Sequence, residues 1–236
     1  MRILLLTTKT PHHLYFAKLI SSNFNLVSTI LEMKSVIPKF TVDHEFEAER
    51  DEYENKILLE EKNINFDIFS ETKAYDNVND EICVDYIKST YPDVIISFGT
   101  GIIRDQIINL FPERIINLHG GDPEYYRGLD SHLWAIYHKQ FDKLDVTLHH
   151  VNETLDDGNL INKGKVKLRK ESKIHTLRSE TTKVCVELVI DSLLNFKEKG
   201  IFDSIPQNRI GRYYSFMPSV LKEVCINNFN NYVREL

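Results

Sequence analysis

The fold is decided by the stretch Ile115-Ile116-Asn117-Leu118-His119-Gly120-Gly121-Asp122-Pro123, an apolar run followed at once by a loop. Side chains alternate between the two faces of a β-strand, so Asn117 and His119 are predicted to lie on the same face. The two glycines and the proline that follow predict a loop. The polar pair therefore stands at the end of a strand, beside a loop.

Two further segments belong to the same stretch, which extends to Ile161. The β-branched run Asp145-Val146-Thr147-Leu148-His149 predicts a second strand, and Leu155-Asp156-Asp157-Gly158 predicts an acidic turn after it. The stretch thus offers an amide, an imidazole and a carboxylate at or beyond strand ends. That set of groups is suited to acyl chemistry.

Strands and helices alternate over residues 1–140. Apolar runs predict strands at 3–6, 26–31, 66–69 and 92–98, while helical spacing predicts helices from Pro11, over 43–61 and over 80–89. This order predicts an α/β fold with a doubly wound, mainly parallel sheet and helices on both faces. We interpret the acidic residues of 43–61 as a solvated helix face.

Ligands of such sheets bind beyond the carboxyl ends of the strands. Phe98, Asn117, His119 and the loop after His149 are expected to gather at that edge. Gly99 and Gly101 follow the central strand, which indicates a close backbone approach by a ligand or a tight turn.

After residue 157 the pattern changes. A strand is predicted over 159–168 and a long helix over 176–199, which Gly200 ends. An aromatic tail begins at residue 201 and leads into a final short helix.

The composition is that of one acidic globular chain of 236 residues, with a net charge of −6 and three cysteines. The acidic balance argues against a nucleic-acid partner, and the lack of a long apolar run or a signal peptide predicts a cytoplasmic protein with no membrane partner. The cysteines are interpreted as buried and reduced, and no metal site is expected from their spacing. The glycine fingerprint of dinucleotide sites is missing, so no nicotinamide cofactor is expected.

These motifs together resemble the folate-dependent formyltransferase family, which includes glycinamide ribonucleotide, methionyl-tRNA and sugar-nucleotide formyltransferases. The resemblance covers residues 93–161, extends back to residue 1, and is carried by Asn117-Leu118-His119, Pro123, Tyr126-Arg127-Gly128, Trp134-Ala135-Ile136, Val146-Thr147-Leu148-His149 and Asp156-Asp157-Gly158. It implies a formyltransferase fold with a short C-terminal extension. On this interpretation residues 1–168 form the catalytic domain, and 169–236 form a helix and aromatic tail packed on the same domain.

The resemblance also implies roles for individual residues. The family's catalytic residues fall on Asn117, His119 and Asp156, where Asp156 is preferred to Asp157 because one residue separates the family's aspartate from its glycine. The formyl donor is expected to be 10-formyl-tetrahydrofolate. Its binding is expected to involve Phe98, Gly99, Gly101, Gly120 and Asp157.

Two motifs depart from the family. The usual Ser-Leu-Leu-Pro after the histidine is Gly120-Gly121-Asp122-Pro123, and the Gly-Ser-Asn phosphate loop of the glycinamide enzymes is missing near residue 8. The second departure weakens glycinamide ribonucleotide as the substrate.

Formyl transfer needs a neutral amine, a stabilised oxyanion and a route for a proton. Asn117 and His119 suit the oxyanion as donors, while Asp156 suits the proton transfer and can hold the imidazole. His149 is predicted either to support Asp156 or to play a cross-strand structural role, and His150 is predicted to face away.

The acceptor expected from the resemblance is the amine of a nucleotide-linked sugar. Such enzymes typically act on a dTDP-linked 4-amino-4,6-dideoxy sugar for surface polysaccharide, such as the O-antigen of lipopolysaccharide. Too few residues follow Asp157 for the barrel domain of the tRNA enzymes. The substrate is expected to contact two groups of residues, the first-loop residues Lys9, His12 and His13 and the aromatic or basic residues Tyr126, Arg127, Tyr213 and Tyr214.

Other classes stay open at this point. They are transfer to another small amine such as glycinamide ribonucleotide, hydrolysis of formyl-folate, and a non-catalytic binding module. A homodimer is also open.

Overall fold

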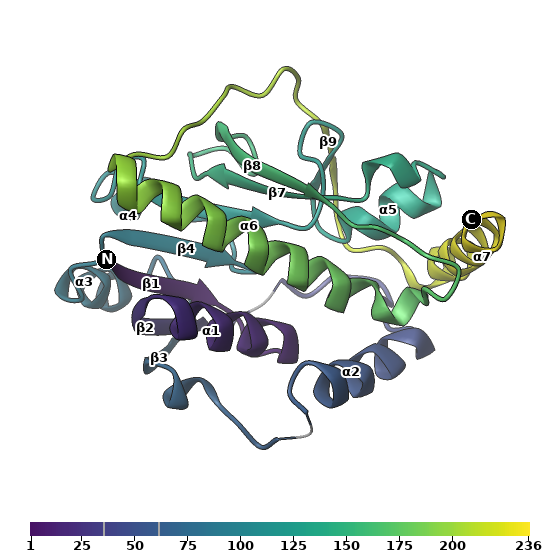
Figure 1. Ribbon diagram of the computed structural model, residues 1–236, viewed down its shortest axis with the longest axis horizontal. Helices are drawn as coiled ribbons and strands as arrows, with labels where there is room; N and C mark the ends of the chain where they lie inside the picture. The colour runs from purple at the N-terminus through teal and green to yellow at the C-terminus, as the bar shows by residue number, and fades with distance from the viewer. Residues whose placement is uncertain (35, 61) are drawn as a thin grey trace.

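A single central sheet organises the chain (Figure 1). The computed structural model describes residues 1–34, 36–60 and 62–236. In these residues the sheet has seven strands in the order β3-β2-β1-β4-β5-β7-β8. Their bounds are β1 Arg2–Thr7, β2 Asn25–Glu32, β3 Glu71–Tyr75, β4 Val94–Phe98, β5 Ile115–His119, β7 Asp145–His150 and β8 Leu160–Lys165.

The sheet is parallel from β3 to β5. β7 then pairs antiparallel with β5, and β8 pairs antiparallel with β7. The expected doubly wound, mainly parallel sheet is therefore confirmed.

Helices cover both faces of this sheet, as Figure 1 shows. The helices α1 (Pro11–Asn23) and α6 (Leu177–Lys199) lie on one face, and α3 (Glu81–Ser89) and α4 (Asp105–Ile108) lie on the other. Strand alternation explains how β1 supports both layers. Ile3 and Leu5 belong to the apolar cluster that contains residues of α1 and α6, whereas Leu4 and Leu6 belong to the cluster with residues of α3.

The C-terminal segment is joined to this core. Leu188 and Phe229 belong to the same apolar cluster as Ile3 and Leu5. The last helix, α7 (Ser219–Glu235), has 17 residues and packs on α5 (Ser131–Tyr137), so it is longer than the short helix predicted. A small parallel sheet joins β6 (Tyr126–Gly128) to β9 (Arg212–Tyr214).

Two expected elements differ from the structure. Residues 66–69 do not form a strand: Phe66–Ile68 is a 3₁₀ turn, η1, and the edge strand β3 follows it. The turn buries Phe66 and leaves Ile68 exposed, while β3 is too polar to show an apolar run. The predicted acidic helix is α2 (Glu45–Ile57); its expected last residue, Glu61, lies outside the described residues.

In the described part of the chain, no helix combines the length and the apolar character needed to span a membrane.

Candidate active site

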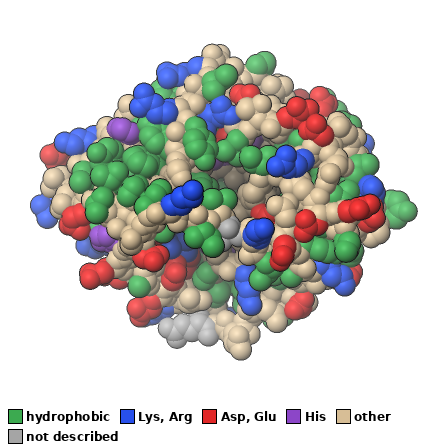
Figure 2. All heavy atoms as spheres, turned by 180° about the vertical axis from the view of Figure 1, so that it is seen from behind, with side chains coloured by type: hydrophobic (Ala, Val, Ile, Leu, Met, Phe, Trp, Pro, Cys, Tyr) green, Lys and Arg blue, Asp and Glu red, His purple; other side chains and the backbone are tan. Residues whose placement is uncertain are grey.

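A cavity of about 470 Å³ contains the polar residues at the end of β5. Its wall includes Ile103, which belongs to the apolar cluster beside α3, and Val151, which packs on that cluster. Phe46 and Leu177 in the wall belong to the cluster beside α1 and α6. The rear view in Figure 2 shows a hollow near the centre of that face, with acidic and basic side chains interspersed around it. Volumes of this order suit small-molecule sites.

His119 is held through one ring nitrogen. Its Nε2 atom lies 2.7 Å from the carbonyl oxygen of Tyr126, and a carbonyl only accepts, so Nε2–H donates. The hydroxyl of Ser131 lies 3.3 Å from the same nitrogen. Nδ1 is therefore the nitrogen that can exchange a proton, and it lies 3.6 Å from Oδ2 of Asp156.

The amide of Asn117 is oriented by the neighbouring strand. Asn117 and His149 are cross-strand partners, and Nδ2 of Asn117 lies 3.2 Å from Nε2 of His149. The Nδ1 atom of His149 lies 2.7 Å from the carbonyl oxygen of His150, so it carries the ring proton. Nε2 then accepts from Asn117, which leaves the second amide N–H of Asn117 as a donor for a ligand.

Asp156 completes this group and is almost fully buried. Its backbone is left-handed, with φ 53°, and its Oδ2 atom accepts from the backbone N–H of Gly128 at 2.8 Å. Burial acts to raise the pKa of Asp156, but the charge of His119, the adjacent His149 and the Gly128 N–H outweigh it and hold the pKa well below its usual range. The carboxylate is thus ionised at neutral pH between two imidazoles.

The loop that carries Asp156 reaches the site by an unexpected route. Because β7 runs antiparallel to β5, the chain leaves β7 at the end of the sheet opposite the carboxyl ends of the parallel strands. The loop still gathers with the expected residues, because Leu155 and Asp156 line the same cavity as Phe98, Asn117 and His119. The loop folds back over the face that carries Asn117 and His119.

The glycine of the Asp-x-Gly motif has a steric reason. A Cβ atom at Gly158 would stand 1.7 Å from the carbonyl oxygen of His150, closer than any side chain permits. The backbone of the returning loop therefore packs directly against the end of β7. The spacing between Asp156 and this contact fixes how far the carboxylate extends over the sheet.

The expected donor-side residues mostly lie together. Phe98, Gly99, Gly101 and Gly120 all line the cavity. Gly99 has φ +83°, and a Cβ atom there would stand 2.5 Å from the ring of His13. The buried carboxylate of Glu32 accepts from the N–H of Gly101 at 2.6 Å and so holds this loop. Asp157 is half-buried and does not line the cavity.

The expected first-loop residues lie in two different environments. His12 and His13 line the cavity, but both are buried. Burial, followed for His12 by the charges of Arg178 and Arg50, lowers the pKa of both rings well below the ordinary value. They are therefore neutral at pH 7. Lys9 is exposed and does not line the cavity.

None of the expected aromatic and basic contacts, Tyr126, Arg127, Tyr213 and Tyr214, is among the described residues that line the cavity. The ring of Tyr214 stacks on Trp134 at 4.8 Å and on Tyr126 at 5.4 Å, while Tyr213 is 61% exposed. Tyr126 instead serves the site through the carbonyl that accepts from His119. The guanidinium of Arg127 donates to the carbonyl of Leu155. From the aromatic tail, Phe216 lines the cavity.

Sequence reasoning missed three residues near the site. Arg50 on α2 and Arg178 on α6 both line the cavity. Gln207 in the tail donates to the carbonyl oxygens of Asp156 and Gly158, both at 2.9 Å. Of the three, only Arg50 had a detectable signal: Glu47, Arg50, Asp51 and Glu54 recur at the spacing of one helix face.

The unusual loop after His119 has its own support. Asp122 is buried, and its carboxylate accepts from Nζ of Lys163 on β8 at 2.6 Å. The hydroxyl of Thr147 donates to the carbonyl of Gly121 at 2.9 Å. An ion pair and a hydrogen bond thus fix the backbone of Gly120-Gly121-Asp122-Pro123.

Comparison with known proteins adds to this geometry. The sequence profile of the formyl transferase family matches residues 4–193. The formyltransferase PseJ from Anoxybacillus kamchatkensis, solved with UDP-4,6-dideoxy-4-formamido-L-AltNAc and tetrahydrofolate, is similar at 20% identity and a TM-score of 0.57, over 91% of this chain and 86% of PseJ. A sugar N-formyltransferase from Shewanella sp FDAARGOS_354 is similar at 16% identity and a TM-score of 0.62, over 97% of this chain and 87% of that one.

HypX from Aquifex aeolicus, solved with tetrahydrofolic acid, is similar at 21% identity and a TM-score of 0.61. The match covers 96% of this chain but only 34% of HypX. At these identities the structural likeness establishes the fold.

Proposed function

The chain belongs to the formyl transferase family, and from that premise we propose that it moves a formyl group from 10-formyl-tetrahydrofolate to the amine of a nucleotide-linked amino sugar. That it is a transferase of formyl groups follows from the family. The observation that carries the catalytic part of the proposal is the convergence of Asn117, His119 and Asp156 in one cavity.

Two donors suit the charge that develops on the formyl oxygen when the amine attacks. The free N–H of Asn117 is fixed because His149 accepts the other one. His119 with a proton on Nδ1 supplies the second donor. Preorganised donors of this kind lower an acyl-transfer barrier by about 3 kcal/mol each.

Asp156 suits the proton transfer. The attacking amine becomes positively charged, and its proton must reach the nitrogen that leaves. The carboxylate of Asp156 is ionised and lies 3.6 Å from both Nδ1 of His119 and Nε2 of His149, just beyond the length of a direct hydrogen bond. We infer that Asp156 receives the proton and that His119 passes it on.

The donor side of the cavity fits a folate. Apolar side chains from the two loops beside the catalytic group, Ile102, Ile103, Val151 and Leu155, suit a flat ring. PseJ and HypX were solved with tetrahydrofolate bound. When bound, the donor supplies the activated formyl group; this chain supplies the oxyanion donors and the proton route.

The acceptor is proposed to bind at the wall that α1, α2 and α6 build. PseJ holds a UDP-linked 4-formamido sugar, and the Shewanella protein is a sugar N-formyltransferase. We therefore propose a nucleotide-linked 4-amino-4,6-dideoxy sugar, with a dTDP-linked one as the first compound to test. We propose that the formylated sugar is a precursor of surface polysaccharide such as lipopolysaccharide O-antigen, and that the transfer takes place in the cytoplasm. Phe216 is the proposed aromatic contact of the tail.

A substrate panel tests the proposal. The purified chain is given 10-formyl-tetrahydrofolate and one amine at a time: dTDP- and UDP-linked 4-amino sugars, and glycinamide ribonucleotide. Formation of a formamido sugar supports the proposal. Formylation of glycinamide ribonucleotide alone, or release of formate without any amine, would replace it with the corresponding alternative. Folate binding without turnover would favour a binding module.

A further inference from the structure

The cavity has an uneven charge distribution. Among the described residues that line it, the lysine and arginine side chains are Arg50 and Arg178 only. They come from different helices, α2 and α6, and both are largely shielded, at 18% and 28% exposure. Two guanidinium groups in the wall of a mostly apolar cavity need a chemical reason.

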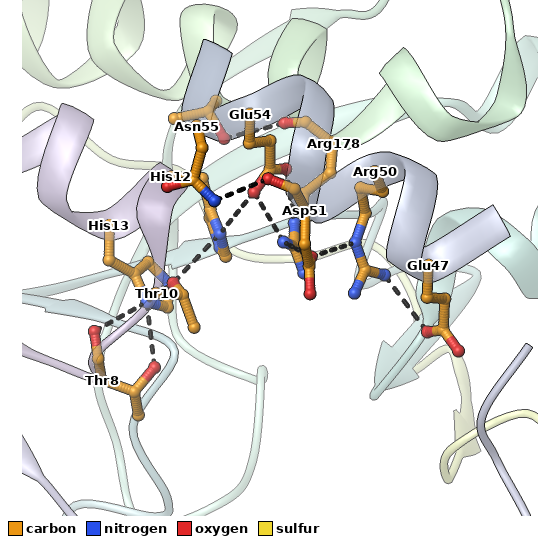
Figure 3. Close-up of polar contacts among 11 residues, drawn as sticks. Thr8, Thr10, His12, His13, Glu47, Arg50, Asp51, Glu54, Asn55 and Arg178 are labelled. Atoms are coloured by element: carbon orange, nitrogen blue, oxygen red, sulfur yellow. Dashed lines mark hydrogen bonds and ion pairs between the residues drawn. The ribbon is translucent and has the colours of Figure 1, made fainter. Parts of the chain in front are cut away.

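Carboxylates accept hydrogen bonds from both arginines (Figure 3). Glu54 is fully buried and accepts from Nε and Nη2 of Arg178 at 2.7 and 2.6 Å. Asp51 accepts with one oxygen from Nη2 of Arg178 at 2.9 Å and from Nε of Arg50 at 3.1 Å. The two cationic groups therefore converge on a single oxygen atom. Nη1 of Arg50 also donates to Glu47 at 3.2 Å.

This arrangement leaves donors available. Within the described residues, Nη2 of Arg50 and Nη1 of Arg178 have no hydrogen-bond partner. Both side chains are already fixed, so a ligand that binds them does not have to order two long side chains. Planar guanidinium groups recognise phosphate and carboxylate oxygens in this fixed geometry.

A purely structural role explains Arg178 but not Arg50. The buried Glu54 needs Arg178, because an unpaired buried carboxylate is costly. Arg50 is not needed for that purpose, since its partners Glu47 and Asp51 are at least 22% exposed and reach solvent. Yet Arg50 turns its side chain to the cavity wall. The charges of both arginines also lower the pKa of the buried ring of His12, after burial itself, so their positive potential reaches the cavity wall.

We propose that Arg50 and Arg178 form the subsite for the diphosphate of the acceptor, at the α2–α6 wall. This inference rests on the proposed nucleotide-linked substrate. It moves the anion site away from Lys9, which is exposed and off the cavity, and from His12 and His13, which are neutral. Two guanidinium groups side by side match two adjacent phosphoryl groups better than one carboxylate.

The test measures anion binding apart from chemistry. Inorganic pyrophosphate and UDP are titrated calorimetrically into the 236-residue chain, into two test variants and into one control variant, and their inhibition of formyl transfer is measured. Arg50→Gln removes one guanidinium. The double variant Arg178→Gln/Glu54→Gln removes the second together with its buried partner, so that no unpaired buried charge is left. Arg114→Gln, an exposed arginine off the cavity, is the matched control.

Arg50→Gln and the double variant are each expected to raise the Kd of pyrophosphate and the KM of the acceptor about tenfold or more, because charge-assisted hydrogen bonds are lost. Tetrahydrofolate affinity is expected to stay within about twofold, and Arg114→Gln to match the parent protein. Circular dichroism confirms that each variant is folded.

Two results separate the inference from the function on which it rests. Unchanged pyrophosphate and UDP affinity in folded Arg50→Gln and in the double variant would overturn the subsite, even if an amino-sugar nucleotide is formylated. Loss of pyrophosphate binding in the variants supports the subsite. If no amino-sugar nucleotide on the panel is formylated as well, the proposed substrate is wrong but the anion subsite stands. A parent protein that binds neither pyrophosphate nor UDP would overturn the subsite as well.

Discussion

Replacing Asp156 by asparagine tests the catalytic group with the smallest change of shape. Asparagine keeps an oxygen that can accept the Gly128 N–H, at 2.8 Å in the parent, but it removes the charge that lies 3.6 Å from both His119 and His149. The proton of the attacking amine then has no carboxylate to receive it. Loss of a positioned base costs about 10²- to 10⁴-fold in rate, which is about 2.7–5.5 kcal/mol in the barrier.

The assay is steady-state formyl transfer at saturating donor and acceptor, with tetrahydrofolate affinity and thermal unfolding measured in parallel. Asp157→Asn is the matched control, because it is the same chemical change one residue away on a side chain that does not line the cavity. We expect Asp156→Asn to lose at least 100-fold in kcat, an estimate from loss of a general base, and Asp157→Asn to stay within a few-fold of the parent. Similar kcat values for the two variants would refute the assignment.

Three further predictions follow from the same geometry. Asn117→Ala and His119→Ala each lose about 100-fold or more in kcat while circular dichroism and ligand affinity stay near the parent, since each removes an oxyanion donor; near-normal turnover in both would contradict this. Gly158→Ala is destabilised by several kcal/mol in urea unfolding, because its Cβ atom would stand 1.7 Å from the carbonyl oxygen of His150; a folded variant with parent stability would show that the loop is not packed there. Although burial opposes it, the pKa of Asp156 is lowered on folding, so this group stabilises the protein above its unfolded pKa of about 3.9, and that contribution is lost as the pH falls below this value. The free energy of unfolding is therefore expected to fall less steeply below about pH 4 in Asp156→Asn than in the parent. Identical slopes would argue against the prediction.

Local patterns in the sequence predicted the elements that local physics determines. The apolar run of β5 with its polar residues two apart predicted that Asn117 and His119 share a face, and both line one cavity. The direction of β7 could not be predicted from a local pattern. Strand direction depends on which neighbour the chain finds in the sheet, and no residue between 145 and 150 encodes that choice.

The acidic helix shows why Arg50 and Arg178 could not be predicted as cavity residues. An amphipathic helix rich in acids usually turns them to solvent, so α2 was interpreted as a solvated face. In the structure Glu54 is fully buried because Arg178, far along the chain on α6, lies opposite it. A pair that depends on two helices meeting has no signature within either helix. The same limit applies to Gln207, whose role depends on the tail crossing the Asp156 loop.

The C-terminal segment adds residues to the site that the strand β5 and the Asp156 loop begin. Gln207 holds the carbonyl of Asp156, whose left-handed backbone is strained for a residue with a side chain. Arg178 and Phe216, from the same segment, line part of the cavity wall. If the acceptor lies against this wall, then a change in the tail that alters acceptor fit also alters the tether on the catalytic carboxylate. Changes of acceptor specificity in this segment are therefore expected to affect kcat together with KM.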